Sequence, residues 1–349
     1  MTDFNPAPAT LDDVVSPAWL GAMLGTRWPG VEVRGVEIVE TLVTQATKVR
    51  LKLDVAGGGA DVPTRICIKG VLVDSGAHPS ASIVETLFYR HAAETLPVTV
   101  PGCIYANLDA TGTRGVTVMH DVIAAGATFC SALVPFTPDE AIDGLEQLAR
   151  LHAAAWEGSD AYALPWIPPF LDRIASAPIM APDVLQGLLD GPRGAPLPAA
   201  IRSADRLQRG LVALAAQVRD QPRCLVHGDA HAGNVYRTAD GTLGLVDWQI
   251  LQKGHWAQDV AYHLAAVLSP EDRRAHERHL LDHYRIRLAA LGGPALDADE
   301  AWASYRAGFV YGYFLWAITR KVEPVLINEF VRRLGLAVDD LDSFGVLGI

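Results

Sequence analysis

The side chains best suited to chemistry lie in one short stretch of the chain, where carboxylate and amide groups dominate. Asp229 follows a short apolar run that reads as a buried strand, and Asn234 stands five positions later. The segment 235–246 reads as a β-hairpin with an Asp-Gly turn, and Asp247 ends its second strand. Because a hairpin brings its two ends together, we expect Asp247 beside Asn234. Their oxygens suit a hard cation such as Mg²⁺, while Asp229, offset toward the loop, is free to accept a proton.

The pattern of this stretch resembles that of a known enzyme superfamily. The run HGDxHxGN over 227–234 follows the order of the protein-kinase catalytic loop with one change. Together with the Asp-Trp pair at 247–248, it is similar to the aminoglycoside phosphotransferase and choline kinase superfamily. Segments 148–156 and 254–262 look closest to the ecdysteroid-kinase-like branch of that superfamily.

This resemblance implies a protein-kinase-like fold, Mg²⁺ as cofactor, and a nucleoside triphosphate, ATP or GTP, as the phosphoryl donor. It also implies that Asn234 and Asp247 hold the metal. Asp229 would be the catalytic residue, which orients the acceptor hydroxyl and accepts its proton. Such a reaction depends mainly on positioning and charge neutralisation.

The remaining parts of a nucleotide site can be sought independently. Lys69, in Ile-Cys-Ile-Lys on the third predicted strand, has the position of the lysine that holds the α- and β-phosphates. Glu85, on the following helix, is the preferred carboxylate partner, and Glu94 is the alternative. The adenine edge is expected to meet backbone groups at the end of the last strand of this region: Met119, His120 and Val122.

Several neighbouring residues are expected to support the catalytic loop rather than to react. His227 would orient the loop through backbone hydrogen bonds, and Asp259 would brace it from the start of a helix. Asp121 reads as a capping residue next to the hinge. For His231, contact with the metal or phosphates and simple packing are equally open.

Periodicity supplies the elements that must position these residues. Alternating patterns predict strands over 33–40, 48–55, 65–72, 104–106 and 116–118, with a helix over about 81–96. In the second strand, Val49, Leu51, Leu53 and Val55 are expected to face inward, and Lys48, Arg50, Lys52 and Asp54 outward. Helices dominate after Pro138, apart from a proline-rich, irregular segment at 159–200. We therefore predict an α+β, two-lobed kinase-like fold, with a nucleotide-binding lobe over 1–120 and a catalytic, substrate-binding lobe over 121–349.

One feature departs from the kinase pattern. The predicted loop 41–47 between the first two strands has no glycine, although loops that cover phosphates usually use glycine for close backbone approach. Thr44, Gln45 and Thr47 are the side-chain donors that the loop offers instead.

The acceptor is less well defined by the sequence. Five aromatic residues crowd one C-terminal helix, either as core or as part of an apolar acceptor pocket: Tyr305, Tyr311, Tyr313, Phe314 and Trp316. An aminoglycoside site would need clustered carboxylates, so the pattern favours a hydroxylated, fairly apolar small molecule. The alternatives are an aminoglycoside or macrolide antibiotic phosphotransferase, and a pseudokinase that binds nucleotide without transferring phosphate.

Composition narrows the class of protein further. The 349 residues carry a formal net charge of −11, which argues against a nucleic-acid partner, and half of them are hydrophobic, which is enough for a sizeable core. Four cysteines without metal-site spacing favour a reducing, cytoplasmic setting. The longest apolar run, 307–318, is too short to span a membrane, so no membrane partner is expected.

Overall fold

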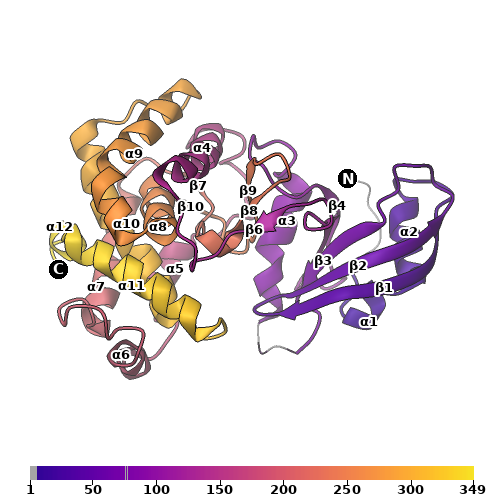
Figure 1. Cartoon of the computed structure of the whole chain (residues 1–349), viewed down its shortest axis with the longest axis horizontal. Helices are drawn as coiled ribbons and strands as arrows, with labels where there is room; N and C mark the ends of the chain where they lie inside the picture. Colours follow the sequence, from indigo (N-terminus) through magenta and orange to yellow (C-terminus); the bar gives the residue numbers. More distant parts are fainter. Residues whose placement is uncertain (1–5, 75, 77) are drawn as a thin grey trace.

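The computed structural model describes residues 6–74, 76 and 78–349, and the remaining positions all fall within the expected first lobe. Its first half is built on a five-stranded antiparallel sheet in the order β1-β2-β3-β5-β4. The strands are β1 (Glu32–Val43), β2 (Thr47–Ala56), β3 (Arg65–Gly70), β4 (Cys103–Leu108) and β5 (Gly115–His120). Figure 1 shows this sheet at one end of the molecule and the helical part at the other.

Two sets of helices flank this sheet. Helices α1 (Leu11–Val14) and α2 (Pro17–Gly25) precede it, and α2 packs against β1. The apolar alternation of β2 and β3 builds the core there, since Val49, Leu51, Ile66 and Ile68 are fully buried. A short 3₁₀ turn, η1 (Pro79–Ser82), leads into α3 (Ile83–His91), which contacts β4 and β5 and separates the sheet from the helical part.

The second half is mainly helical. Its helices are α4 (Pro138–Ala154), α5 (Phe170–Ser176), α6 (Pro182–Asp190), α7 (Ala204–Arg219), α8 (Trp256–Val267), α9 (Pro270–Ala290), α10 (Ala298–Ile318), α11 (Pro324–Asp340) and α12 (Ser343–Val346). Two small sheets accompany these helices. They consist of β6 (Thr128–Phe129), β8 (Val235–Arg237) and β9 (Leu243–Leu245), and of β7 (Cys224–Val226) with β10 (Gln252–Gly254); a 3₁₀ turn, η2 (Ala232–Asn234), precedes β8.

Most predicted elements are present, with two corrections. The segment 159–200 is not irregular throughout, because α5 and α6 form within it, and α6 begins at the helix-compatible Pro182. The second concerns the loop predicted over 41–47, which spans only 44–46 because β1 ends at Val43 and β2 begins at Thr47. Lys48 and Arg50 lie on the face away from the core, as expected, and line a cleft there. The alternation of β2 thus separates a core face, with Val49 and Leu51, from a cleft face, with Lys48 and Arg50.

The described residues contain no helix that is both long and apolar enough to span a bilayer. The run 307–318 lies within α10, where its aromatic side chains are buried against neighbouring helices.

Candidate active site

A buried ion cluster joins three segments that are far apart in the sequence. Lys69 on β3 places its Nζ 2.6 Å from Glu85 Oε2 on α3 and 2.9 Å from Asp247 Oδ1, which follows β9. Only 5% of the Lys69 side chain and 4% of the Glu85 side chain are exposed. The second carboxylate oxygen of Glu85 accepts a hydrogen bond from the backbone N–H of Trp248 at 3.3 Å. Glu85, and not the exposed Glu94, is therefore the partner of Lys69.

The charges in this cluster shift each other's proton affinity. Burial alone would lower the pKa of Lys69, but Asp247 and Glu85 outweigh it and hold that pKa above its usual value. Burial likewise acts to raise the pKa of Asp247, yet Lys69 and Lys48 bring it well below the usual range. The pKa of Glu85 moves upward because burial outweighs its attraction to Lys69. Asp247 is thus the most acidic group of the cluster.

The loop between β7 and β8 presents Asp229 with both carboxylate oxygens engaged. Oδ1 accepts a hydrogen bond from the Tyr262 hydroxyl at 2.9 Å, and Oδ2 accepts one from Asn234 Nδ2 at 3.1 Å. The same Nδ2 also donates to the backbone oxygen of Asp229 at 2.9 Å. The Tyr262 hydroxyl in turn accepts a hydrogen bond from Trp316 Nε1 at 2.6 Å. These contacts fix the orientation of a carboxylate that keeps 29% of its side chain exposed.

Asp259 and His227 fix this loop through hydrogen bonds with its backbone. Asp259, at the start of α8, accepts hydrogen bonds from the backbone N–H groups of His227 at 2.6 Å and Gly228 at 2.8 Å. His227 Nδ1 accepts from the Asp229 N–H at 3.1 Å, so Nε2 carries the proton and donates to Val246 O at 3.0 Å. Burial lowers the pKa of His227, which keeps the ring neutral in this role. The geometry gives both residues the positioning contacts that the sequence suggested.

The residues expected to hold Mg²⁺ fit that ion in their chemistry. The Val246 N–H donates to Asn234 O at 3.0 Å, so the hairpin brings Asp247 beside Asn234 as expected. Asn234 uses its amide nitrogen on Asp229, which leaves its amide oxygen as the donor atom for a cation. Within the described chain, no group of three or more His, Cys, Asp or Glu side chains is arranged for a metal ion. One carboxylate and one amide match an ion such as Mg²⁺ that takes its other ligands from phosphates and water.

A cleft of about 330 Å³ opens directly from this cluster. Met119, His120 and Val122 line it at the end of β5, as expected for a base-binding edge. Its remaining wall includes residues that the sequence did not single out for this role, most clearly Lys48, Arg50 and Cys67. The register of β2 and β3 contained the signal, because Lys48 lies opposite Lys69 and Arg50 opposite Cys67.

Asp121 joins β2 to the segment that follows β5. Its carboxylate accepts hydrogen bonds from the N–H groups of Ile123 and Ala124 at 3.1 and 3.2 Å, which is the capping role predicted for it. It also forms an ion pair with Arg50, Nε to Oδ2 at 3.0 Å, and Arg50 reaches Glu40 at 2.9 Å. Arg50 therefore fixes β2 against the connection between the two halves.

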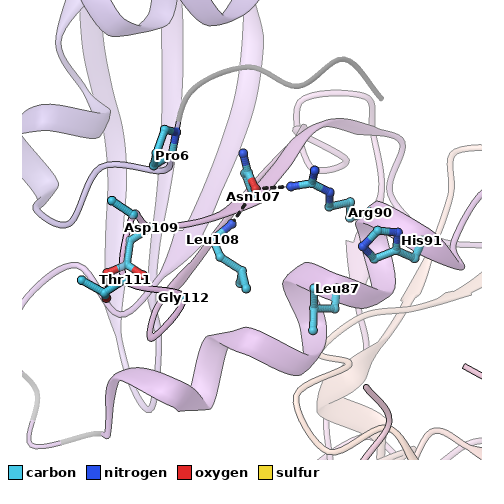
Figure 2. A pocket seen from close by; sticks show the side chains of 10 residues that line it. Pro6, Leu87, Arg90, His91, Asn107, Leu108, Asp109, Thr111 and Gly112 are labelled. Carbon is cyan, nitrogen blue, oxygen red and sulfur yellow. Dashed lines mark hydrogen bonds between the residues drawn. The ribbon is translucent and has the colours of Figure 1, made fainter. Parts of the chain in front are cut away.

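A larger hollow of about 730 Å³ lies elsewhere and brings together none of these groups (Figure 2). It is an open depression between the turn after β4 and the residues Leu87, Arg90 and His91 of α3. In this region Arg90 donates to the side chain of Asn107. Lys69, Glu85 and Asp247 line the smaller cleft and not the larger hollow, so the smaller cleft is the candidate active site. Asp229 and Asn234 are not among its lining residues.

The aromatic residues of α10 divide into core and site. Tyr305 donates to Glu277, and Tyr313 to Ile201 O, both in fully buried positions. Tyr311 accepts from Gln252 Nε2 at 2.8 Å, also in the core. Two of them contact Tyr262, the hydrogen-bond partner of Asp229: Trp316 donates to its hydroxyl at 2.6 Å, and Tyr311 packs edge-on against it with ring centroids 6.2 Å apart. Core packing therefore accounts for most of this group.

Comparison with known proteins identifies the family. A sequence model of APH, the phosphotransferase enzyme family, matches residues 84–307, which is more than half of the chain. The chain belongs to this family. It is accordingly a phosphotransferase that acts on hydroxyl groups of small molecules. A search of curated protein sequences finds no significant match.

Solved structures show the same fold at low sequence identity. The microcompartment-associated aminopropanol kinase is 16% identical with a TM-score of 0.53, over 93% of this chain and 98% of that one. The Plasmodium vivax ethanolamine kinase is 14% identical with a TM-score of 0.51, over 89% of this chain and 83% of that one. These likenesses confirm the predicted α+β kinase-like fold. The ecdysteroid-kinase-like branch stays a prediction.

Proposed function

We propose that this phosphotransferase is a small-molecule kinase that transfers the γ-phosphoryl group of ATP or GTP to a hydroxyl of a fairly apolar small molecule, with Mg²⁺. The observation that carries the proposal is the buried Lys69 ammonium, 2.6 Å from Glu85 and 2.9 Å from Asp247 at the edge of the cleft. A lysine desolvated to this degree and held by two carboxylates from other elements is well placed to receive the α- and β-phosphates.

Two lobes meet at this cleft in the proposed arrangement. We assign residues 1–120 to nucleotide binding and residues 121–349 to catalysis and acceptor binding. Met119, His120 and Val122 would contact the base through their backbone groups at the junction. Asn234 and Asp247 would hold Mg²⁺, which supplies charge neutralisation for the phosphates when it is bound.

We assign the acceptor proton to Asp229. Tyr262 and Asn234 each occupy one direction on its carboxylate, and the remaining lone pairs are available to an acceptor hydroxyl. As the acceptor oxygen bonds to the γ-phosphorus, its proton passes to Asp229. The bond from that phosphorus to the β–γ bridging oxygen breaks, and the nucleoside diphosphate leaves.

The surroundings of Asp229 support an apolar acceptor. His231 packs against Trp316 and Phe330 with ring centroids 5.0 and 5.1 Å apart, and Trp316 stacks on Phe330 at 4.0 Å. His231 Nε2 lies 3.7 Å from Asp229 Oδ2, so this aromatic group adjoins the carboxylate directly. Trp316 and Phe330 are 5% and 2% exposed, so they give the carboxylate an apolar backing, while His231 keeps 13% of its side chain exposed. An apolar group of the acceptor would be favoured beside such rings.

The test is phosphoryl transfer by the purified protein with Mg²⁺ and ATP or GTP, followed by ³¹P NMR. The acceptor library holds steroidal and phenolic alcohols, sugars, amino alcohols and aminoglycosides. We expect a new phosphomonoester from one of the steroidal or phenolic alcohols. Asp229→Asn should lower the transfer rate at least a hundred-fold and leave nucleotide affinity within a few-fold. Transfer to aminoglycosides alone would show that the proposed apolar acceptor is wrong. Nucleotide binding without transfer to any acceptor would favour the pseudokinase alternative.

A further inference from the structure

Lys48 is a second lysine that faces the nucleotide cleft. On β2 it lies directly opposite Lys69 of β3, so both side chains stand on the same face of the sheet. Lys48 is 30% exposed and lines the cleft, whereas its strand neighbour Val49 is buried in the core on the other face. Two like charges in directly opposite positions repel each other unless an anion lies between them.

In this structure the anion is the carboxylate of Asp247. Its Oδ1 is 2.9 Å from Lys69 Nζ, and its Oδ2 is 3.3 Å from Lys48 Nζ. Asp247 reaches this position with a φ of 69°, in the left-handed region that residues other than glycine seldom adopt. Lys48 and Lys69 are thus both directed at one anion position. That position is occupied by Asp247, which we also assign to Mg²⁺ binding.

Neither Thr44, in the loop between β1 and β2, nor Thr47, the first residue of β2, offers a competing donor. Thr47 is buried on the core face, with its hydroxyl away from the cleft, and the Thr44 hydroxyl donates to Ala46 O at 3.4 Å within the turn. Thr44 and Thr47 are therefore not the phosphate donors that the sequence suggested for this glycine-free segment. Lys48, the second residue of β2, is the first cation in sequence after this loop, and it lines the cleft.

We propose that Lys48 is a second phosphate-binding residue, and that the polyphosphate chain of a nucleoside triphosphate takes the place of the Asp247 carboxylate between Lys48 and Lys69. Asp247 is then released toward Mg²⁺. This inference rests on the proposed function and deepens it, because it supplies the phosphate contact that a glycine-rich loop provides in other kinases.

The experiment compares Lys48→Met with Lys52→Met. Lys52 lies on the same strand, is half exposed, pairs with Glu37 at 3.5 Å and does not line the cleft. Calorimetric titrations with Mg²⁺ would use the β,γ-imido analogues of ATP and GTP, the matching diphosphates, and adenosine and guanosine. Denaturant unfolding of each variant reports whether the fold is intact.

Lys48→Met should weaken triphosphate-analogue binding about ten-fold or more, which is about 1.4 kcal/mol, and diphosphate binding less. It should leave nucleoside binding within two-fold, and Lys48→Arg should restore most of the loss. Lys52→Met should change none of these affinities. Provided that the wild type binds the triphosphate analogue, two results would overturn the role of Lys48. One is that Lys48→Met loses nucleoside and triphosphate affinity equally, and the other is that it loses no affinity at all. Absence of triphosphate binding by the wild type would instead remove the proposed function itself.

Discussion

Replacing Glu85 with glutamine removes one charge from the buried cluster and almost no volume. In the wild type, Glu85 Oε2 lies 2.6 Å from Lys69 Nζ, and Oε1 accepts the N–H of Trp248 at 3.3 Å. A glutamine can keep the second contact through its amide oxygen. Lys69 would then have only Asp247, 2.9 Å away, as a charged partner.

The size of the effect follows from what remains around Lys69. Losing one partner of a buried ion pair costs about 3–5 kcal/mol when the other charge is left unpaired. Because Asp247 still neutralises Lys69, the expected loss is that of a charge-assisted hydrogen bond, about 1.5–3 kcal/mol of unfolding free energy. Lys69 would also bind Asp247 more tightly, so it would compete with Mg²⁺ for that carboxylate and weaken Mg²⁺–nucleotide binding about ten-fold.

Urea unfolding and calorimetric titration with a non-hydrolysable Mg²⁺–ATP analogue measure both effects. Glu94→Gln is the matched control, since Glu94 lies just beyond α3 and is exposed. We expect the control to stay within about 0.5 kcal/mol of the wild type. If Glu85→Gln behaves like the control in both measurements, the pairing of Glu85 with Lys69 has no role in stability or in nucleotide binding, and the reasoning fails.

Three further outcomes are expected. Asp247→Asn should abolish the Mg²⁺ dependence of nucleotide binding; calorimetry with and without Mg²⁺ would show an unchanged Mg²⁺ effect if the metal assignment is wrong. Tyr262→Phe, which removes one hydrogen bond to Asp229, should lower kcat roughly ten-fold with little change in the KM for nucleotide, and steady-state kinetics showing the reverse pattern would place Tyr262 elsewhere. Burial lowers the pKa of His255 to about 3 and that of His263 to about 4, so their stability contribution is complete above the unfolded pKa of about 6.5 and is lost as pH falls below it. Each should contribute about 2 kcal/mol less at pH 5.0 than at pH 7.5. Urea unfolding of His255→Asn should be less pH-dependent by that amount, and an unaltered pH dependence would contradict the burial of a neutral ring.

The sequence was most informative where function depends on short spacing. Asp229, Asn234 and Asp247 lie within twenty residues, and a single hairpin dictates their proximity, so their arrangement could be predicted from turn chemistry. Lys69 and Glu85 were found because one strand and the next helix carry them. The choice of Lys69 and Glu85 also drew on the resemblance, because Lys69 has the place of the lysine in the kinase V-A-I-K motif and Glu85 that of the glutamate in the family motif Glu-x-x-Phe-Tyr.

Residues whose role depends on long-range packing were missed. Alternation along β2 grouped Lys48 with Arg50 correctly, but it could not show that their face borders a cleft, because that depends on what packs over the sheet. The contacts of Asp229 with Tyr262 and through it with Trp316 join α8 and α10 to a loop far earlier in the chain. Proline in 159–200 suggested irregular structure, although proline at a first helical position is compatible with the start of α6.

The most direct test of the central claim is whether the cleft around Lys69 binds a nucleoside triphosphate. We would titrate the wild-type protein, Lys69→Met and the surface variant Lys52→Met with the β,γ-imido analogues of ATP and GTP in the presence of Mg²⁺. Saturable one-to-one binding by the wild type and Lys52→Met, weakened at least ten-fold in a folded Lys69→Met, is the predicted result. Binding that is absent from the wild type, or equally tight in Lys69→Met, would contradict the claim that this cleft is the nucleotide site of the phosphotransferase.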